Sequence, residues 1–290
     1  MNQQNKSFIA KIEEFILMKT KPEYMDSQEK VDQFLLERSN ISEQEVKSSL
    51  FKSKDIDGTQ IFTFGDENSE NIVMFIHGGA YINEINMQHF LFCYILAHQA
   101  NAYVIAPVYP LTPNHTYKES FEIITGLYKK ILKTEKAITM MGDSAGGGFV
   151  HSFCQYLNTV DLTQPNHIIT FSPWVDISMD NIPDNISEND PILGKIGLKE
   201  IGKAWAGDLD TKNYKVSPLY GDNENLAKTL IFAGDNEIFY KDIVKYVEKL
   251  KDDGVDVRLI TGKGLFHIYP LFPMPEMRGA LKEIKKEILL

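Results

Sequence analysis

Short apolar runs alternate with longer amphipathic stretches over most of the 290-residue chain. Runs that are apolar at consecutive positions are typical of strands buried on both faces of a sheet. They are Ile72–Ile76, Ala102–Ala106, Ala137–Met141, His167–Phe171, Thr229–Ala233 and Val255–Ile260. The stretches that follow them have helical spacing: Met87–Gln99, Tyr117–Leu132, Gly147–Leu157, Lys241–Lys251 and Pro275–Leu289. Strand and helix in alternation predict a parallel sheet with helices on both faces.

Residues 1–65 follow a different pattern from the rest of the chain. Two stretches of helical spacing come first, and the apolar positions of the leading one are Phe8, Ile9, Ile12, Phe15 and Ile16. Residues 46–65 are strand-like and are broken by Asp57-Gly58, a dipeptide that favours a tight hairpin turn because glycine accepts positive φ. Together with the six apolar runs, this hairpin predicts an α/β fold with an eight-stranded, mostly parallel sheet.

Residues 178–220 interrupt the alternation of strand and helix. They are rich in Asp, Asn, Pro and Gly, and they contain one short helical pattern at Leu198–Trp205. Segments of this composition run over the surface of a domain, so we expect an insertion that covers one end of the sheet. No repeat, low-complexity tract or linker divides the chain, so a single domain over residues 1–290 is expected.

The charge balance and the cysteines narrow the possible partners and compartments. Thirty Lys and Arg against forty Asp and Glu give a formal net charge of −10, which leaves no excess positive charge for nucleic-acid phosphates. No apolar run approaches the ~18 residues that a bilayer span requires, and Met1 to Met18 lack the apolar core of a signal peptide. Cys93 and Cys154 lack the spacing of a metal site or a disulfide framework, which favours buried free thiols and a cytoplasmic location.

The strongest chemical signal is the pentapeptide Gly142-Asp143-Ser144-Ala145-Gly146, which follows an expected strand and opens an expected helix. It fits the G-x-S-x-G pattern, in which a turn too tight for neighbouring side chains lifts a serine hydroxyl above the strand end. Backbone N–H groups at the start of the helix stabilise negative charge beside that serine. Because pentapeptides match by chance, a glycine-rich turn that only packs a helix on the sheet is the alternative.

A second signal lies upstream, where the first buried strand runs into His77-Gly78-Gly79-Ala80-Tyr81. Small residues at such a place let backbone N–H groups approach a developing oxyanion, as in the HGGG-type loop. Ala80 stands where that pattern has a third glycine, and it keeps its N–H donor although its backbone is more restricted. His77 is expected to hold the loop in place.

A serine nucleophile needs a base, and His267 is the histidine that follows the last expected strand. This position agrees with the order serine, acid, histidine that accompanies such a nucleophile turn. The other histidines fall on expected helices, strands or an early loop, where a structural role is favoured. They are His77, His89, His98, His115, His151 and His167.

The acid should follow the strand Thr229–Ala233, and three carboxylates compete for that role. Each of Asp235, Glu237 and Asp242 could orient and stabilise an imidazole. Spacing from Gly234 favours Glu237, and Asp235 is the runner-up. Asp242 already belongs to the next expected helix, where a helix-start or packing role is favoured.

The motifs and their order resemble those of the hormone-sensitive-lipase family of α/β-hydrolases, in its bacterial esterase branch. The resemblance spans residues 72–273 and includes Gly142–Gly147, Ser172–Asp176 and Gly234–Asp242, besides the His77 and His267 segments. It implies the α/β-hydrolase fold and a triad of Ser144, Glu237 and His267. It also implies an oxyanion hole formed by the N–H groups of Gly79, Ala80 and Ala145, with Gly78 in support.

The resemblance also bears on the regions around the expected site. It implies a helical cap at residues 1–45 and makes residues 178–220 a cap-like insertion, although Phe8, Ile12 and Phe15 could instead pack on the core. Where the family usually has Tyr-Arg-Leu-Ala-Pro-Glu, this chain has the segment Tyr109–Asn114, which reads Tyr-Pro-Leu-Thr-Pro-Asn. The missing Arg and Glu remove a charged network near the nucleophile, which affects the substrate subclass and not the chemistry.

The expected activity is that of a serine carboxylesterase that forms an acyl-enzyme and requires neither a metal nor an organic cofactor. Because the cap should enclose the pocket, small esters with short acyl chains are the expected substrates. An arylformamidase or other amidase, or a lactonase, would use the same site, and these activities stay open. A non-catalytic ligand-binding protein of this fold is disfavoured because His267 is present. The last helix suits packing on the sheet as well as a homodimer contact.

Overall fold

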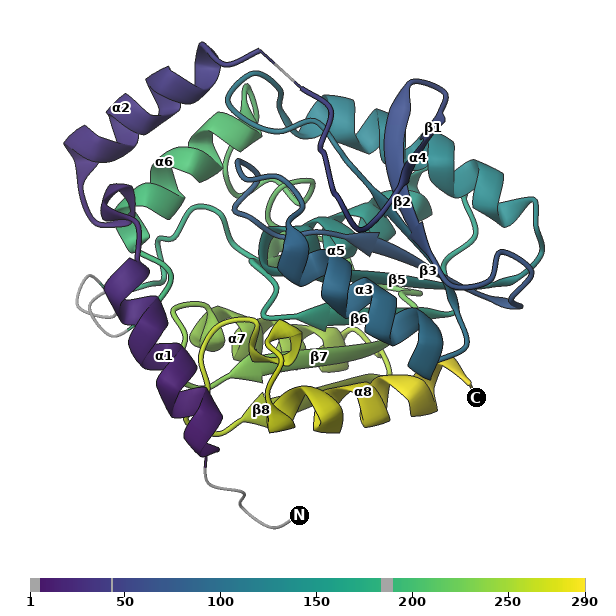
Figure 1. The fold of residues 1–290 in the computed structure, drawn as a ribbon. Coiled ribbons are helices and arrows are strands. Elements are labelled where there is room, and N and C mark those ends of the chain that lie inside the picture. The colour runs from purple at the N-terminus through teal and green to yellow at the C-terminus, as the bar shows by residue number, and fades with distance from the viewer. Residues whose placement is uncertain (1–5, 43, 184–189, 290) are drawn as a thin grey trace.

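An eight-stranded sheet forms the centre of the computed structural model, which describes residues 6–42, 44–183 and 190–289 (Figure 1). Its strand order is β1-β2-β4-β3-β5-β6-β7-β8. The strands are β1 (Ser53–Ile56), β2 (Thr59–Phe64), β3 (Asn71–Ile76), β4 (Tyr103–Pro107), β5 (Ala137–Asp143), β6 (His167–Phe171), β7 (Lys228–Gly234) and β8 (Val257–Gly262). The pairs β1–β2 and β2–β4 are antiparallel, and all other neighbours are parallel. The prediction of an eight-stranded, mostly parallel sheet is therefore confirmed.

The expected hairpin occupies one edge of the sheet. Asp57 and Gly58 connect its two strands with φ values of 55° and 80°, and Ile56 pairs with Thr59 across the turn. A turn with positive φ at both central residues matches the right-handed twist of the flanking strands. The dipeptide therefore forms the turn that its sequence indicated.

Helices cover both faces of the sheet, as the alternating pattern predicted. They are α1 (Phe8–Thr20), η1 (Glu23–Met25), α2 (Gln28–Ser39), α3 (Met87–Gln99), α4 (Tyr117–Leu132), α5 (Ser144–Thr159), α6 (Lys195–Ala206), η3 (Pro218–Tyr220), α7 (Tyr240–Asp252), η4 (Tyr269–Leu271) and α8 (Pro275–Ile288). One apolar cluster unites one face of the sheet with α3 and α8, and another unites the opposite face with α4, α5 and α7.

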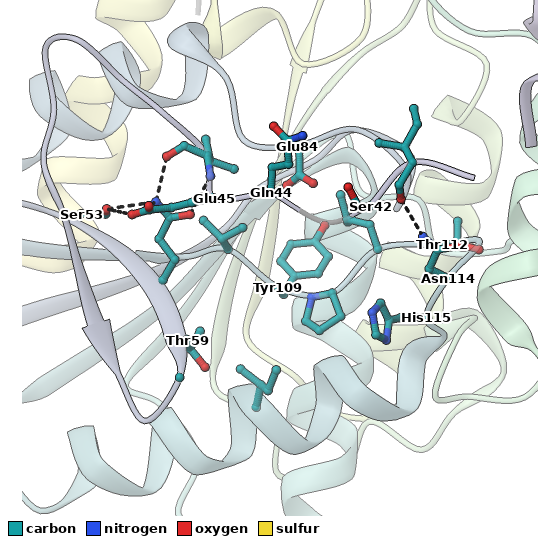
Figure 2. Close-up of a pocket in the computed structure, with 18 of the residues that line it drawn as sticks. Ser42, Gln44, Glu45, Ser53, Thr59, Glu84, Tyr109, Thr112, Asn114 and His115 are labelled. Carbon is teal, nitrogen blue, oxygen red and sulfur yellow. Dashed lines mark hydrogen bonds between the residues drawn. The ribbon is translucent and has the colours of Figure 1, made fainter. Parts of the chain in front are cut away.

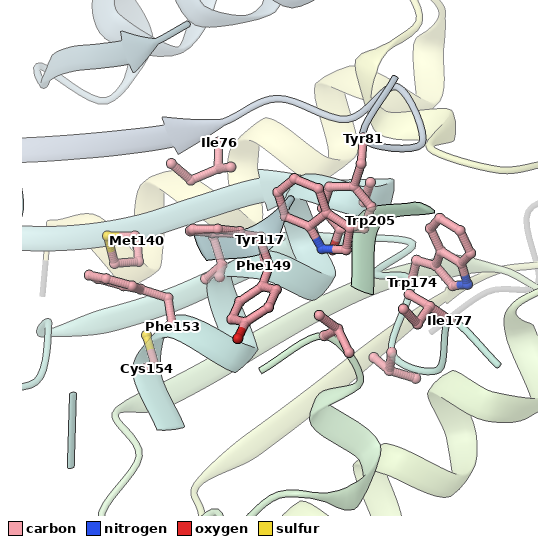
Figure 3. Packing of buried hydrophobic residues seen from close by; sticks show 14 of the residues in the cluster. Ile76, Tyr81, Tyr117, Met140, Phe149, Phe153, Cys154, Trp174, Ile177 and Trp205 are labelled. Atoms are coloured by element: carbon pink, nitrogen blue, oxygen red, sulfur yellow. The ribbon is translucent and has the colours of Figure 1, made fainter. Parts of the chain in front are cut away.

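Strand β3 shows why its apolar run is continuous. Val73 and Phe75 belong to the cluster with α3 and α8, whereas Met74 and Ile76 belong to the cluster with α4, α5 and α7. Because successive side chains of a strand point to opposite faces, a strand covered on both sides must be apolar at every position. Figure 3 shows part of the second cluster, which includes Ile76 of β3 and Phe149 of α5.

The last strand starts later than its sequence pattern indicated. The apolar run begins at Val255, but β8 begins at Val257. The Val255 N–H donates to the carbonyl of Leu250 at 2.9 Å, which makes Val255 part of the turn that closes α7. As the last strand of the sheet, β8 is also only partly buried.

The segment 178–220 contains α6 and η3 and, within its described residues, no sheet strand. Residues 184–189 of this expected insertion lie outside the described residues. The helical part is longer than the Leu198–Trp205 pattern, and α6 packs against α2 and η1 at one side of the molecule (Figure 1).

The apolar stripe of α1 faces solvent. Phe8 is 76% exposed, Phe15 is 63% exposed, and Ile12 is exposed as well. The side of α1 that faces the protein carries Ala10 and Leu17. The alternative in which this stripe packs on the core is therefore wrong.

Both cysteines are buried and carry free thiols, as their spacing predicted. Cys93 lies in α3 and Cys154 lies in α5, so each belongs to one of the two apolar clusters. Within the described ranges, no helix combines the length and the apolar character that crossing a membrane would demand.

Candidate active site

The expected site residues follow strands that end at one edge of the sheet. β3 and β5 are neighbours although β4 separates them in sequence, so the strand order reverses at this point. In open α/β sheets such a reversal leaves a crevice beyond the carboxyl ends of the two strands. The loop that begins at His77 therefore lies beside Ser144. The next strands, β6 to β8, bring in the segments of Ser172, Glu237 and His267.

Ser144 occupies the sharp turn between β5 and α5. Its φ is +51°, a left-handed conformation that non-glycine residues rarely adopt, and its side chain is 6% exposed. A Cβ at Gly146 would lie 2.1 Å from the carbonyl oxygen of Ile76, and one at Gly142 would lie 2.6 Å from that of Gly146. The two glycines are therefore required by space, which explains why this strained turn has the G-x-S-x-G sequence.

Ser144, His267 and Glu237 lie together at this edge. The distance from His267 Nε2 to Ser144 Oγ is 2.8 Å, which is an ordinary hydrogen-bond length. His267 Nδ1 lies 3.5 Å from Glu237 Oε1, and neither atom has a hydrogen bond to another described residue. Contacts of this kind are often long before substrate binds and tighten in the complex. His267 Nε2 can therefore accept the proton of Ser144 Oγ, while the carboxylate of Glu237 faces the other ring nitrogen, Nδ1.

The other oxygen of Glu237 is held by two donors. Glu237 Oε2 accepts hydrogen bonds from Ser172 Oγ at 2.7 Å and from the Gly234 N–H at 3.0 Å. Ser172 Oγ in turn accepts from the Ile268 N–H at 2.9 Å. Sequence reasoning gave Ser172 no role. Two signals were available: Ser172 belongs to the Ser172–Asp176 segment of the resemblance, and it is the first residue after β6, at the same edge as the other site residues.

The two competing carboxylates have other surroundings. Asp235 is exposed, and its Oδ1 accepts a hydrogen bond from the Gly264 N–H. Asp242 lies in the first turn of α7, where burial, with the nearby charge of Asp176 second, raises its pKa to about 6. Neither carboxylate is directed at His267 as Glu237 is.

The loop after β3 has three successive residues with positive φ: Gly79 (112°), Ala80 (54°) and Tyr81 (60°). The Gly78 N–H donates to Asp143 Oδ1 at 2.8 Å, so Gly78 fastens the loop to the turn of Ser144. Within the described part of the chain, no hydrogen bond occupies the N–H of Gly79 or of Ala80. Ala145 lies in the first turn of α5, where N–H groups have no partner within the helix.

His77 holds this loop in place through two hydrogen bonds and a ring contact. Its Nδ1–H donates to the carbonyl of Gly78 at 2.7 Å, and its own carbonyl accepts from the hydroxyl of Tyr109 at 2.7 Å. The His77 and Tyr109 rings stack with centroids 4.4 Å apart. Burial lowers the pKa of His77 to about 3, so its ring is neutral at physiological pH. This geometry agrees with the structural role expected for His77.

Asp143 and His89 form a supporting contact that the sequence did not predict, although a structural role was expected for His89. Asp143 is fully buried, and His89 Nε2 lies 3.4 Å from its Oδ2. Because the Asn86 N–H donates to His89 Nδ1 at 3.1 Å, the proton of the His89 ring is on Nε2 and faces Asp143. Asp143 thereby connects α3, the loop after β3 and the turn of Ser144.

A row of aromatic rings runs from α6 to His267. Tyr81 stacks on Trp205 with centroids 4.1 Å apart and on Trp174 at 5.8 Å (Figure 3). Trp174 stacks on Phe239 at 5.7 Å, and Phe239 meets the His267 ring edge-on at 5.2 Å. Aromatic pairs at these distances stabilise one another beyond the area they bury. The row therefore fixes the loops of Tyr81 and His267 relative to each other.

A cavity of about 820 Å³ is lined by residues 41, 42 and 44–46, by the β1–β2 hairpin and by residues 108–115 (Figure 2). Ser144, Glu237 and His267 are not among the described residues that line it. Pro110 and Asn114, which stand where the resembling family has Arg and Glu, do line it. Ser144, Glu237 and His267 therefore lie outside this cavity, whereas Tyr109, which contacts His77, borders it.

The described residues contain no group of three or more His, Cys, Asp or Glu side chains that could hold a metal ion. The chemistry available at the strand ends is that of a hydroxyl, an imidazole, a carboxylate and backbone N–H groups. This is the combination by which a serine attacks a carbonyl carbon.

Comparison with known proteins identifies the class of protein. A model of the α/β-hydrolase fold matches residues 73–271, and the chain belongs to this family. An esterase of Acinetobacter venetianus is 26% identical over 224 residues, which cover 75% of this chain and 74% of the relative. An acetyl-hydrolase of Streptomyces hygroscopicus is 23% identical, with 72% of each chain covered.

A solved structure extends the likeness to nearly the whole chain. A hormone-sensitive lipase from a metagenome library superimposes with a TM-score of 0.80 at 22% identity, covering 99% of both chains. The fold expected from the sequence and the resemblance to hormone-sensitive-lipase-type esterases are confirmed. The expectation of an enzyme of the serine hydrolase type is confirmed with them.

Proposed function

We propose that this protein hydrolyses small, short-acyl carboxylic esters through a Ser144-His267-Glu237 triad. The observation that carries the proposal is the 2.8 Å contact between Ser144 Oγ and His267 Nε2 at the carboxyl edge of the sheet. We assign the oxyanion hole to the N–H groups of Gly79 and Ala80, on the loop after β3, and of Ala145, in the first turn of α5. The names of the relatives, esterase and acetyl-hydrolase, support an ester substrate.

The proposed reaction has two halves. As Ser144 Oγ attacks the ester carbonyl, His267 Nε2 takes its proton, and the carboxylate of Glu237 stabilises the resulting imidazolium. The N–H groups of Gly79, Ala80 and Ala145 stabilise the oxyanion, and His267 then gives the proton to the leaving alcohol. In the second half, His267 activates a water that hydrolyses the acyl-enzyme. Every proton in this sequence moves through the chain's own residues.

The proposed preference for small substrates rests on a cap that restricts the space above the site. Residues 1–45 and 178–220 are proposed to cover the site, within one α/β-hydrolase domain. The side chains of Tyr81, Trp174 and Trp205 support this idea, because they are fully buried and fill space between α6 and the loop after β3. A long acyl chain would have to displace this aromatic packing.

Replacing the nucleophile tests the proposal. Ser144→Ala is expected to reduce kcat on p-nitrophenyl acetate by about 10⁴-fold or more, because members of a triad act as a unit. Covalent labelling by a fluorophosphonate should disappear as well. Ser152→Ala is a matched control, since Ser152 lies on the same helix with a buried hydroxyl that has no hydrogen bond to a described residue. The control should retain both activity and labelling.

Two outcomes would count against the proposal. Wild-type turnover by Ser144→Ala would exclude Ser144 as the nucleophile. A kcat/KM that rises steadily from acetyl to palmitoyl esters would exclude the preference for short acyl chains. Including an N-formyl anilide and a lactone in the same panel separates ester hydrolysis from the two related activities.

A further inference from the structure

Helix α1 carries a group of exposed apolar side chains that nothing in the described structure covers. They are Phe8, Ile9, Ile12, Phe15, Ile16 and Met18, and we call them the outer face of α1. Most recur every three or four residues, so they share one side of the helix. An apolar surface of this kind on a folded domain marks an interaction site.

Helix α1, which carries the outer face, contacts the segments of Glu237 and His267. On the inner side of α1, Glu14 Oε1 accepts a hydrogen bond from Asn236 Nδ2 at 3.0 Å, next to Glu237. Lys6 Nζ lies 6.0 Å from the centre of the Phe266 ring, next to His267. The outer face therefore lies on a helix fixed to the site edge of the molecule, as the position of α1 in Figure 1 shows.

A third contact fixes the start of the helix. The backbone N–H and the hydroxyl of Ser7 donate to the two carboxylate oxygens of Glu276 in α8, at 2.8 and 3.0 Å. The Ser7 hydroxyl also accepts from the Ala10 N–H, as a helix cap. The helix is thus anchored at its first turn, and exposure of its apolar side is part of the fold.

Charge distinguishes the outer face from the rest of the molecule. Lys11 and Lys19 are exposed beside it, and Lys19 Nζ lies 5.7 Å from the centre of the Phe15 ring. The two carboxylates of α1, Glu13 and Glu14, are half-buried. An apolar and cationic face is therefore presented by a chain whose net charge is −10.

This combination favours an anionic lipid surface over a second copy of the chain. A symmetric dimer through the outer face would bring Lys11 and Lys19 of one copy against the same residues of the other. Like charges at such a contact repel. Anionic headgroups, by contrast, attract lysines that border an apolar helix face.

We propose that α1 docks on the surface of an anionic phospholipid bilayer. Phe8, Ile12 and Phe15 enter the boundary between headgroups and acyl chains, and Lys11 and Lys19 contact the phosphates. A short helix with one apolar and cationic face lies in the plane of such an interface. The proposal concerns binding alone, so it does not depend on the proposed catalytic function.

Cosedimentation with vesicles of phosphatidylglycerol and phosphatidylcholine in equal parts tests the proposal. The full chain should bind these vesicles, bind pure phosphatidylcholine vesicles far more weakly, and lose affinity as salt is raised. Phe8→Ser with Phe15→Ser should weaken binding by about tenfold or more, because each ring loses its burial in the lipid. Lys11→Gln with Lys19→Gln should weaken it by about tenfold.

Leu50→Ser is the matched control, because Leu50 is 72% exposed and lies outside α1. This variant should bind as the wild type does. All substituted side chains are exposed, and an unchanged thermal midpoint verifies folding. Failure of the wild type to bind the anionic vesicles, or full binding by both double variants, would overturn the proposal. A wild-type dimer that the phenylalanine variant dissociates, without vesicle binding, would assign the face to a second copy instead.

Discussion

Asp235 and Glu237 have similar carboxylates two positions apart and opposite surroundings. Asp235 is exposed and bonds a backbone N–H across the loop, whereas Glu237 is buried beside the imidazole of His267. A buried carboxylate without full hydrogen bonding interacts strongly with an adjacent imidazolium, and an exposed one is screened by water. Residue type alone does not distinguish these two cases, so at this scale surroundings decide the role.

Neutralising each carboxylate separates the two roles. Glu237→Gln is expected to lower kcat by about 10²- to 10⁴-fold, because the imidazolium that forms in the reaction loses its counter-charge. Asp235→Asn is the matched variant and should change kcat by less than about threefold, since its Oδ1 still accepts from Gly264. Steady-state rates on p-nitrophenyl acetate measure both. A larger loss in Asp235→Asn would reverse the assignment of the acid.

At the scale of elements, one serine hydroxyl connects the segments that follow three neighbouring strands. Ser172, directly after β6, donates to Glu237 in the loop after β7 and accepts from Ile268 in the loop after β8. Its φ of +47° is the strained conformation that directs it to this edge. The three loops are therefore positioned as a unit, and the hydroxyl of Ser172 is a positioning group.

Removing that hydroxyl should lower activity without changing the nucleophile. Ser172→Ala is expected to reduce kcat about tenfold or more with little change in KM, because Glu237 and the Ile268 N–H each lose a buried partner. Ser172→Gly lacks the hydroxyl but accepts the positive φ without strain. Both variants should be impaired to a similar degree in steady-state assays. Near-normal kcat in Ser172→Gly would show that the hydrogen bonds of the Ser172 hydroxyl are not required for activity.

The pattern of elements was largely predictable because each element satisfies a local rule. Continuous apolar runs identified β3 to β7, and Asp57-Gly58 identified the hairpin turn. The start of β8 and the orientation of α1 were not predictable. Val255 is as apolar as a strand residue, but it forms part of the turn after α7. The helical spacing of Phe8 and Phe15 predicts that they share one side of a helix, but it does not predict whether that side faces the protein or solvent.

For the whole molecule, Asp242 makes stability depend on pH. Burial, with the charge of Asp176 second, raises its pKa from 3.8 to about 6, while Asn181 and Lys245 act in the opposite direction. Between these two values the folded protein keeps a proton that the unfolded chain has already lost. The contribution of Asp242 therefore favours folding at low pH and is lost as the pH rises from about 4 to 6.

Asp242→Asn removes this dependence. The variant should be more stable than the wild type at pH 7 to 8 by about 1–3 kcal/mol, which corresponds to a few degrees in Tm. The gain should shrink toward zero as the pH falls from 6 to 4, as thermal unfolding at several pH values would show. Asp235→Asn controls for net charge, because it neutralises an exposed carboxylate and should leave Tm nearly unchanged. A gain of equal size at every pH would contradict this account.

The sequence by itself determined the alternation of strands and helices, the tight turn that carries Ser144 and the position of His267 after the last strand. These features are local, because each follows from residue types within a short stretch of sequence, such as the glycines at 142 and 146 or the histidine after the last strand. The tertiary structure decided what depends on burial and on contacts between distant segments: that Glu237 and not Asp235 faces His267, that Ser172 and His89 support the site, and that α1 turns its apolar stripe to solvent. Burial depends on which distant segments pack together in the folded chain, so it cannot be predicted from the order of residues alone.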